Sequence, residues 1–413
     1  MTGAYQPEVP RFSLDEREQR WGRVRQLMAR DRLDVIVVPR FAGPWDGGNA
    51  NARYLSGLGG NGAGGTIIFP LAEEVTAIVG PVPAREYWLA FQDWVTDIRF
   101  AGRNLALEAG GSGSSGFRAG SGVVERLREL KLERGRIGLA GLSGSPRLPD
   151  GIVPHGLYVG LQEAFPQAEL VDATGLLDEA RVVKSAEELA FMERALALAE
   201  DAIDTLIKEA RPGVPEATVY MRMLSSMVEH GGEIPTLLLW SAGWPQPYRT
   251  YMLPSQKPLQ AGDVINAEID GNYGGYRAQF TITATLGHTR PEYQDMFRVQ
   301  QEALQACYAH LRPGIRMGEL LPICEAAAKG TPYTCRLIMH SRGLGDDAPV
   351  IVFGARDPKI LNWPIEENHS FIIKPVVWKG EWEQFVCWGD QVVVTAHGPR
   401  RLGKRPPALL EIL

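Results

Sequence analysis

The stretch Gly262–Gly287, GDVINAEIDGNYGGYRAQFTITATLG, has the pattern of two strands joined by a tight turn. β-Branched residues such as Val264 favour an extended backbone on either side of Asn272–Gly275, whose residue types favour a turn. Three polar side chains interrupt the strand-like runs: Glu268, Asp270 and Gln279. A polar group inside a sheet is costly unless it is paired, so these positions indicate a site.

The composition is that of an ordinary soluble globular protein, with 413 residues, 45% hydrophobic and 22% charged. A net charge of −6 gives no reason to expect nucleic acid or an anionic membrane as a partner. The N-terminal segment lacks the apolar core of a signal peptide, and no apolar run is long enough to span a membrane. Four cysteines without close CxxC spacing suit a reduced compartment. We therefore expect a cytoplasmic protein.

The chain divides into two parts of different pattern. Helices alternate with short apolar strands between residues 16 and 172, which predicts an α/β layer domain. The segment ATGLLDEARVVK, residues 173–184, forms the boundary, and Ser185 with Glu188 predicts a capping box at the start of a long helix. We predict an N-terminal domain of residues 1–173 and a C-terminal domain of residues 174–413.

The second half contains an internal repeat. Arg211-Pro-Gly recurs as Arg312-Pro-Gly, each between two helical segments. The stretch Lys257–Glu268 then aligns without gaps to Trp363–Lys374. Two helix–helix–sheet units of similar length should pack about a pseudo-twofold axis. The alignment predicts that its last pair, Glu268 and Lys374, are equivalent positions near that axis.

These features resemble the creatinase/aminopeptidase P/prolidase family, whose catalytic domain has the pita-bread fold. The resemblance covers nearly the whole chain and rests on the boundary segment and on the LxxGD, GGY, His-Ser-x-Gly-Leu and DQVVVT segments. It implies an α+β protein with an N-terminal α/β domain, a pita-bread domain built from the internal repeat, and a homodimer. Within the family, Arg20-Trp21 and Met339–Pro349 are somewhat similar to the dimethylsulfoniopropionate lyase branch.

Metal-dependent members of this family hold two metal ions with two aspartates, one histidine and two glutamates. Carried over in that order, with a further histidine last, these positions fall on Glu268, Gln279, His340, Lys374, Gly389 and Tyr251. Only His340 is unchanged, and Asp270 lies two residues from the first position. The set retains one carboxylate and gains an ammonium, which repels cations, so we expect no metal and no cofactor.

The altered set nevertheless keeps groups that can do chemistry. His340 titrates near neutrality and is a candidate general acid or base, or else a satisfied core histidine. Lys374 has three interpretations: an ion-pair partner of Glu268, a ligand for a substrate carboxylate, or a base or Schiff-base amine. Glu268 is a candidate to orient His340, and Tyr251 to donate to a developing oxyanion or only to fill the core.

Other residues near these positions are candidates for binding the substrate. They are Asp270, Gln279, Arg342, Trp240, Tyr248, Trp378 and Asp390. Arg342 suits a carboxylate, although a surface role explains it equally well. The tryptophans flanking the site segments favour a small planar or apolar substrate, although core packing explains them too.

The sequence thus predicts a metal-independent hydrolase of a small non-peptide substrate, acting on a C–N or related bond by acid/base catalysis. Two alternatives remain open. One is a lyase that abstracts a proton and expels a leaving group, and the other is a non-catalytic pseudopeptidase that binds a ligand or partner.

Overall fold

The computed structural model divides the chain into two compact units, Met1–Arg181 and Val182–Leu413. The structure describes residues 8–40, 47–59, 64–80, 85–100, 121–144, 148–235, 238–247, 254–345, 348–352 and 357–413. Helix α7 (Thr174–Val182) extends to the end of the first unit, whereas the sequence prediction put the boundary before it, at residue 173. Among the described helices, none has the length and apolar character needed to cross a membrane.

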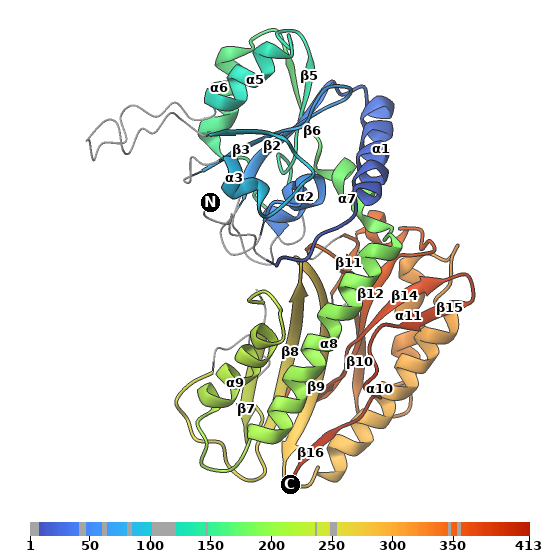
Figure 1. The fold of residues 1–413 in the computed structure, drawn as a ribbon. Helices are drawn as coiled ribbons and strands as arrows, with labels where there is room; N and C mark the ends of the chain where they lie inside the picture. The colour runs from blue at the N-terminus through green and yellow to red at the C-terminus, as the bar shows by residue number, and fades with distance from the viewer. Residues whose placement is uncertain are drawn as a thin grey trace, which may run out of the picture. The chain divides into compact units, whose positions relative to one another are not determined.

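The first unit is an α/β layer around one six-stranded sheet of order β4-β3-β2-β1-β5-β6 (Figure 1). Its elements are α1 (Leu14–Asp31), β1 (Val35–Val38), α2 (Gly47–Ser56), β2 (Gly65–Pro70), β3 (Thr76–Val79), α3 (Arg85–Leu89), β4 (Asp97–Phe100), α5 (Ser121–Glu129), β5 (Arg136–Leu139), α6 (His155–Ala164), β6 (Glu169–Asp172) and α7. Apolar residues of β1, β5, α5 and α6 form a common core, because the strands are apolar on both faces. The α/β layer predicted for this half is confirmed.

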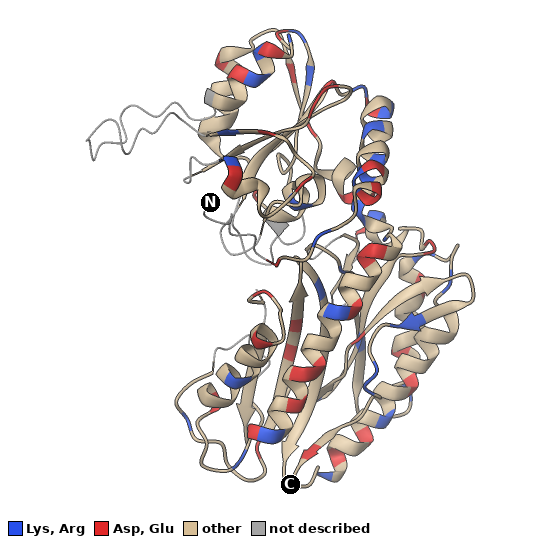
Figure 2. Ribbon diagram, viewed as in Figure 1, with Lys and Arg blue, Asp and Glu red and all other residues tan. Residues whose placement is uncertain are grey.

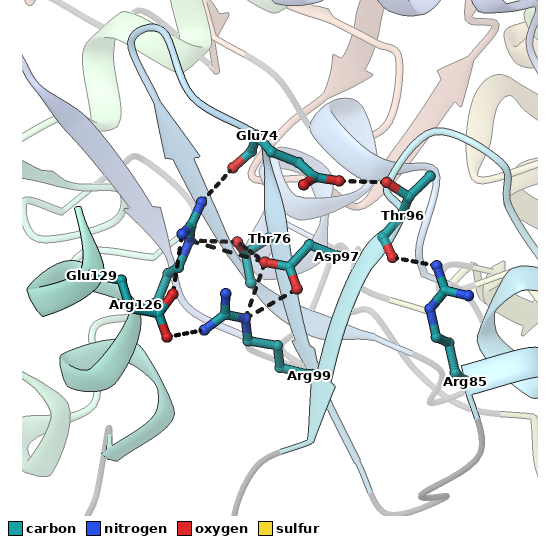
Figure 3. Close-up of polar contacts among 8 residues, drawn as sticks. All are labelled: Glu74, Thr76, Arg85, Thr96, Asp97, Arg99, Arg126 and Glu129. Carbon is teal, nitrogen blue, oxygen red and sulfur yellow. Dashed lines mark hydrogen bonds and ion pairs between the residues drawn. The ribbon is translucent and has the colours of Figure 1, made fainter.

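A charged network joins the edge of this sheet to α5 (Figure 3). Asp97 accepts a hydrogen bond from Thr76 at 2.6 Å and pairs with Arg99 at 3.0 Å. Arg99 also pairs with Glu129 of α5 at 2.8 Å, and Arg126 donates to Thr76 at 2.9 Å. Because most of these groups are partly exposed, the network orients α5 against the sheet more than it stabilises the unit.

The second unit contains two antiparallel-rich sheets, of order β16-β9-β8-β7 and β11-β10-β12-β14-β15, with β13 paired to β12. Helices α8 and α9 pack on the first sheet, and α10 and α11 on the second (Figure 1). The elements are α8 (Ala186–Glu209), α9 (Glu216–Glu229), β7 (Leu238–Gly243), β8 (Val264–Tyr273), β9 (Tyr276–Leu286), α10 (Pro291–His310), the short 3₁₀ helix η3 (Met317–Glu319), α11 (Leu320–Ala326), β10 (Thr334–Ser341), β11 (Val350–Ile351), α12 (Pro358–Leu361), β12 (Ser370–Lys379), β13 (Gln384–Cys387), β14 (Asp390–Thr395), β15 (Gly398–Arg401) and β16 (Leu410–Ile412). The predicted capping box of Ser185 and Glu188 begins α8.

The internal repeat predicted from the sequence is confirmed in the backbone. The two halves make the same isolated bridges at aligned positions, Pro215 with Pro258 and Arg316 with Pro364. The same backbone donor then follows in each half: Glu216 N donates to Lys257 O, and Met317 N to Trp363 O, both at 3.0 Å. Strands β8 and β12 are therefore equivalent, and so are Glu268 and Lys374 within them.

The hairpin β8–β9 has one apolar face and one polar face, because side chains alternate along a strand. Ile265, Ile269 and Gly271 lie on the face that meets α8. At Gly271 the helix approaches so closely that an added Cβ would lie 1.7 Å from the backbone oxygen of Ala195. Gly271 therefore allows the close approach of α8 to the hairpin. Glu268 and Asp270 lie on the opposite face.

We predict that Gly271→Ala lowers the free energy of unfolding by about 3 kcal/mol or more, because a methyl group there must displace helix backbone. Urea denaturation followed by circular dichroism measures the change. Gly175→Ala is the matched control, because this helical, exposed glycine has open space around its Cβ position. The control should be neutral or stabilising by about 0.5–1 kcal/mol. Equal stability of the two variants would show that α8 does not seat on Gly271.

Candidate functional site

A buried ion pair links the two sheets of the second unit at the repeat positions. Lys374 Nζ of β12 donates to Glu268 Oε2 of β8 at 3.2 Å and to Gln279 Oε1 of β9 at 3.0 Å. Gln279 Nε2 lies 3.3 Å from the same Glu268 oxygen, so the three side chains form a closed triangle. All three are buried, with Glu268 the most accessible at 8%. The predicted pairing of Glu268 with Lys374 is thus present in the structure.

A second buried ion pair joins strand β8 to the opposite sheet. Arg342, just beyond β10, donates to Asp270 Oδ1 at 2.9 Å, and both side chains are completely buried. Asp270 lies opposite Gln279 in the hairpin register, on the same face as Glu268. Each acidic residue in the middle of β8 is therefore matched by a basic residue from the opposite sheet. Figure 2 shows the acidic positions in red on β8.

His340 lies beside the triangle on the neighbouring strand. It is opposite Ile372 in the β10–β12 register, and Lys374 is opposite Ile338, so His340 and Lys374 are diagonal neighbours on one face. Such neighbours have Cα atoms about 7–8 Å apart, within reach of a long side chain. His340 is 1% exposed, and its Nδ1 lies 3.3 Å from the Ser341 carbonyl oxygen. The register thus places His340 on the same face of the sheet as Lys374, diagonally across the strand pair.

An aromatic pair continues this face away from Lys374. Trp378 follows Lys374 by four residues in β12 and therefore projects to the same side. Its ring stacks on Trp382, with centroids 4.1 Å apart and planes inclined by 8°. Both rings pack on an apolar cluster that includes Ile338 and Val376. Trp378 stays a candidate substrate contact, and Trp382, one of the tryptophans flanking the last strands, is its stacking partner.

Gly389 gives space to the Lys374 side chain, a role that the sequence did not predict. It bonds Thr281 in both directions, donating to its carbonyl at 2.9 Å and accepting from its amide at 3.4 Å. An added Cβ would lie 2.5 Å from Lys374 Cγ and 2.7 Å from Thr281 Oγ1. The lysine stem therefore passes over a position that has no room for a side chain. The signal available in the sequence was a glycine placed directly before an apolar strand.

Two other predicted contacts lie elsewhere in the unit. Trp240 Nε1 donates to Glu216 of α9 at 2.7 Å, so this ring packs under the helix layer and not against the triangle. Asp390 follows Gly389 and faces the other side of β14, where it accepts from Tyr308 at 2.8 Å and pairs with Arg401. Burial raises the pKa of Asp390 despite the opposing charge of Arg401. We therefore leave Trp240 and Asp390 out of the candidate site. The predictions for Tyr248 and Tyr251 fall outside the described residues.

Comparison with known proteins identifies the class of protein. Residues 20–183 match the creatinase/prolidase N-terminal domain, and residues 190–396 match metallopeptidase family M24. The chain therefore belongs to metallopeptidase family M24, and the predicted family and fold are confirmed.

Individual relatives are named for peptide hydrolysis. An uncharacterized peptidase of Bacillus subtilis is 25% identical over 260 residues, which are 62% of this chain and 72% of the relative. An Xaa-Pro dipeptidase of Pyrococcus horikoshii is 20% identical over 400 residues, covering 96% of this chain and all of the relative. The fold is similar to the crystal structure of an X-Pro aminopeptidase from Thermotoga maritima, with a TM-score of 0.74 at 18% identity over 95% and 99% of the two chains.

These relatives contradict the function predicted from the sequence. A metal-independent hydrolase of a small non-peptide substrate is not what proteins of this similarity are named for. One physical cause of the error was the weight given to aromatic residues, since Trp240 is bonded to a helix and Trp388 is wholly buried. The chain is a member of a peptidase family, and the relatives described above are named as a peptidase, a dipeptidase and an aminopeptidase. The segment Arg20-Trp21, used for the lyase alternative, is tied within the first unit: Arg20 pairs with Glu16, and Trp21 donates to Leu55 O.

The side chains at the family's metal positions do not fit a pair of metal ions. The triangle offers one carboxylate and one amide, and both are already bonded to the Lys374 ammonium. Across the described ranges, no group of three or more histidine, cysteine, aspartate and glutamate side chains is arranged to hold a metal ion. Divalent ions need several oxygen or nitrogen ligands and are repelled by an ammonium. We therefore derive no step of the chemistry through a metal ion.

We predict that Arg342→Met lowers the free energy of unfolding by about 3–5 kcal/mol, because it leaves the Asp270 carboxylate buried without this opposite charge. The double variant Arg342→Met/Asp270→Leu should recover most of that loss, because no charge then remains buried at the pair. Urea denaturation of the wild type and of both variants measures the two effects.

The exposed pair Arg298–Glu302 provides the control for this cycle, with side chains 62% and 54% accessible. Arg298→Met should change stability by less than about 1 kcal/mol. If Arg342→Met were as mild as Arg298→Met, the buried pair between Asp270 and Arg342 would not exist in solution.

Proposed function

We propose that this protein hydrolyses short peptides and that Xaa-Pro dipeptides are the first class of substrate to test. The observation that carries the proposal is the 400-residue similarity to an Xaa-Pro dipeptidase, which runs through both units and includes all of that relative. The candidate site supports it, because the polar triangle lies on the inner face of the pita-bread unit together with His340.

The charges of the site suit a dipeptide, which carries an ammonium at one end and a carboxylate at the other. Lys374 supplies donors for a carbonyl or carboxylate oxygen, and Glu268 accepts from an amine. His340, the diagonal neighbour of Lys374, is the group that holds or transfers a proton near neutral pH. Trp378 and Trp382 offer an apolar surface farther along β12 for a side chain or a proline ring.

We predict that the purified full chain releases proline from a panel of Xaa-Pro dipeptides. Cleavage is followed by chromatography of the free amino acids, with each added divalent ion and with a chelator as separate conditions. His340→Ala should lower kcat/KM by about 100-fold or more, because proton transfer by a positioned side chain contributes at least that factor.

His310→Ala is the matched control for that variant. His310 lies exposed at the end of α10, where its Nδ1 is 2.8 Å from the Ala306 carbonyl oxygen, and its loss should leave turnover unchanged. A folded wild-type chain that cleaves no short peptide under any of the conditions would overturn the proposal. Full activity in His340→Ala would remove His340 from the mechanism.

We also propose that the chain is a homodimer, as the family resemblance implies. Size-exclusion chromatography with light scattering should give twice the mass of one chain across a tenfold range of concentration. A single-chain mass at every concentration would refute it.

A further inference from the structure

The Lys374 side chain occupies the space between Glu268, Gln279 and Gly389. The ideal Cβ of a residue at position 389 would lie 2.5 Å from Lys374 Cγ and 2.9 Å from Lys374 Cδ. Non-bonded carbon atoms prefer to be about 3.5–4.0 Å apart, so a side chain at 389 would have to displace the Lys374 stem from its present path, and Thr281 Oγ1, 2.7 Å from the same Cβ position, would have to shift as well. The backbone at 389 is also held in place, because Gly389 and Thr281 bond each other in both directions.

The two carboxylates of this face are matched by basic side chains without any bound ion. Lys374 lies 3.2 Å from Glu268, and Arg342 lies 2.9 Å from Asp270. Arg277 of β9, completely buried on the same face of the hairpin, adds a further positive side chain, so these five side chains leave no net negative charge to hold a cation. A divalent cation entering there would have to displace the ammonium and would meet the buried guanidinium two strand positions away.

The geometry points to Lys374 as a resident cation that takes the place and the charge of bound metal, with Gly389 as the residue that makes room for it. The two residues work as one device. Lys374 supplies the positive charge, and the absence of a side chain at Gly389 leaves the space through which the Lys374 stem reaches Glu268 and Gln279. The inference concerns the charge held beside Glu268 and Gln279 in the absence of any substrate, so it does not rest on the proposed peptide hydrolysis.

Replacing Lys374, Gly389 and Gln279 with residues that can bind metal tests the inference. The variant Gln279→Asp/Lys374→Glu/Gly389→Glu places three new carboxylates beside Glu268 and His340, the oxygen and nitrogen donors that divalent ions prefer. Isothermal titration with Mn²⁺ and Zn²⁺, and elemental analysis after dialysis, measure binding on the full chain. The triple variant should hold at least one equivalent and bind roughly 100-fold or more tightly than the wild type, which should hold far less than one equivalent.

Two matched variants separate charge from space. Lys374→Met removes the ammonium but adds no donor, so it should gain no comparable metal affinity. Gln279→Asp/Lys374→Glu, with Gly389 kept, should gain less than the triple variant. A triple variant that folds, as judged by circular dichroism, but binds no metal would overturn the assignment of Lys374 and Gly389.

The wild type supplies an independent test should the triple variant fail to fold. If the wild type holds an equivalent of metal that Glu268→Gln or His340→Ala abolishes, the pocket binds metal with Lys374 in place and the inference is wrong. Metal content is measured without a substrate, so failure here and failure of the peptide assay are distinguishable.

Discussion

The second unit depends on neutralising charges that its fold buries on the inner face of one hairpin. Glu268 and Asp270 occupy the middle of β8, where helix α8 covers one face and the second sheet covers the other. An uncompensated carboxylate in such a place costs several kcal/mol, so the facing sheet must supply opposite charge. Lys374 and Arg342 do so from β12 and from the end of β10. With both pairs formed, neither carboxylate is left uncompensated where the two sheets meet.

These pairs decide arrangement more than they add stability. A buried ion pair returns little net free energy once the desolvation of both charges is counted. Its directional bonds nevertheless fix how the two sheets meet: the ammonium reaches two strands of the first sheet, Glu268 on β8 and Gln279 on β9. Bound metal ions join ligands from several strands in the same way. The triangle therefore offers a structural replacement for metal as well as an electrostatic one.

The sequence predicted those parts of the site that follow from local rules or from the repeat. The capping box of Ser185 and Glu188 is a short-range pattern, and it begins α8 in the structure. The meeting of Glu268 and Lys374 followed from a gapless alignment of two segments, because equivalent strands of a pseudo-twofold unit bring equivalent positions together. The Asp270–Arg342 pair was not foreseen, because the contact depends on how two sheets lie across each other and neither residue has a repeat partner that signals it.

Two of the predicted contacts lie away from the triangle because of the strand face that each side chain takes. Trp240 pairs in register with Ala267, on the side that meets α8 and α9, and Asp390 points opposite to Gly389. Alternation along β14 was enough to separate Asp390 from Gly389, whereas the side taken by Trp240 required the β7–β8 register, which the sequence does not set.

Lys374 and Gly389 have to be interpreted together, because both stand at positions where the family's metal-dependent members have ligands. Taken alone, the glycine at 389 is a lost ligand and the lysine at 374 is an intrusive charge. The geometry joins them, because a Cβ at 389 would meet the lysine stem at 2.5 Å. A larger residue at 389 would meet both the Lys374 stem and Thr281 Oγ1, so the path that Lys374 takes to Glu268 depends on the glycine. Gln279 completes the arrangement, because its amide accepts from Lys374 and donates toward Glu268, which a second carboxylate could not do.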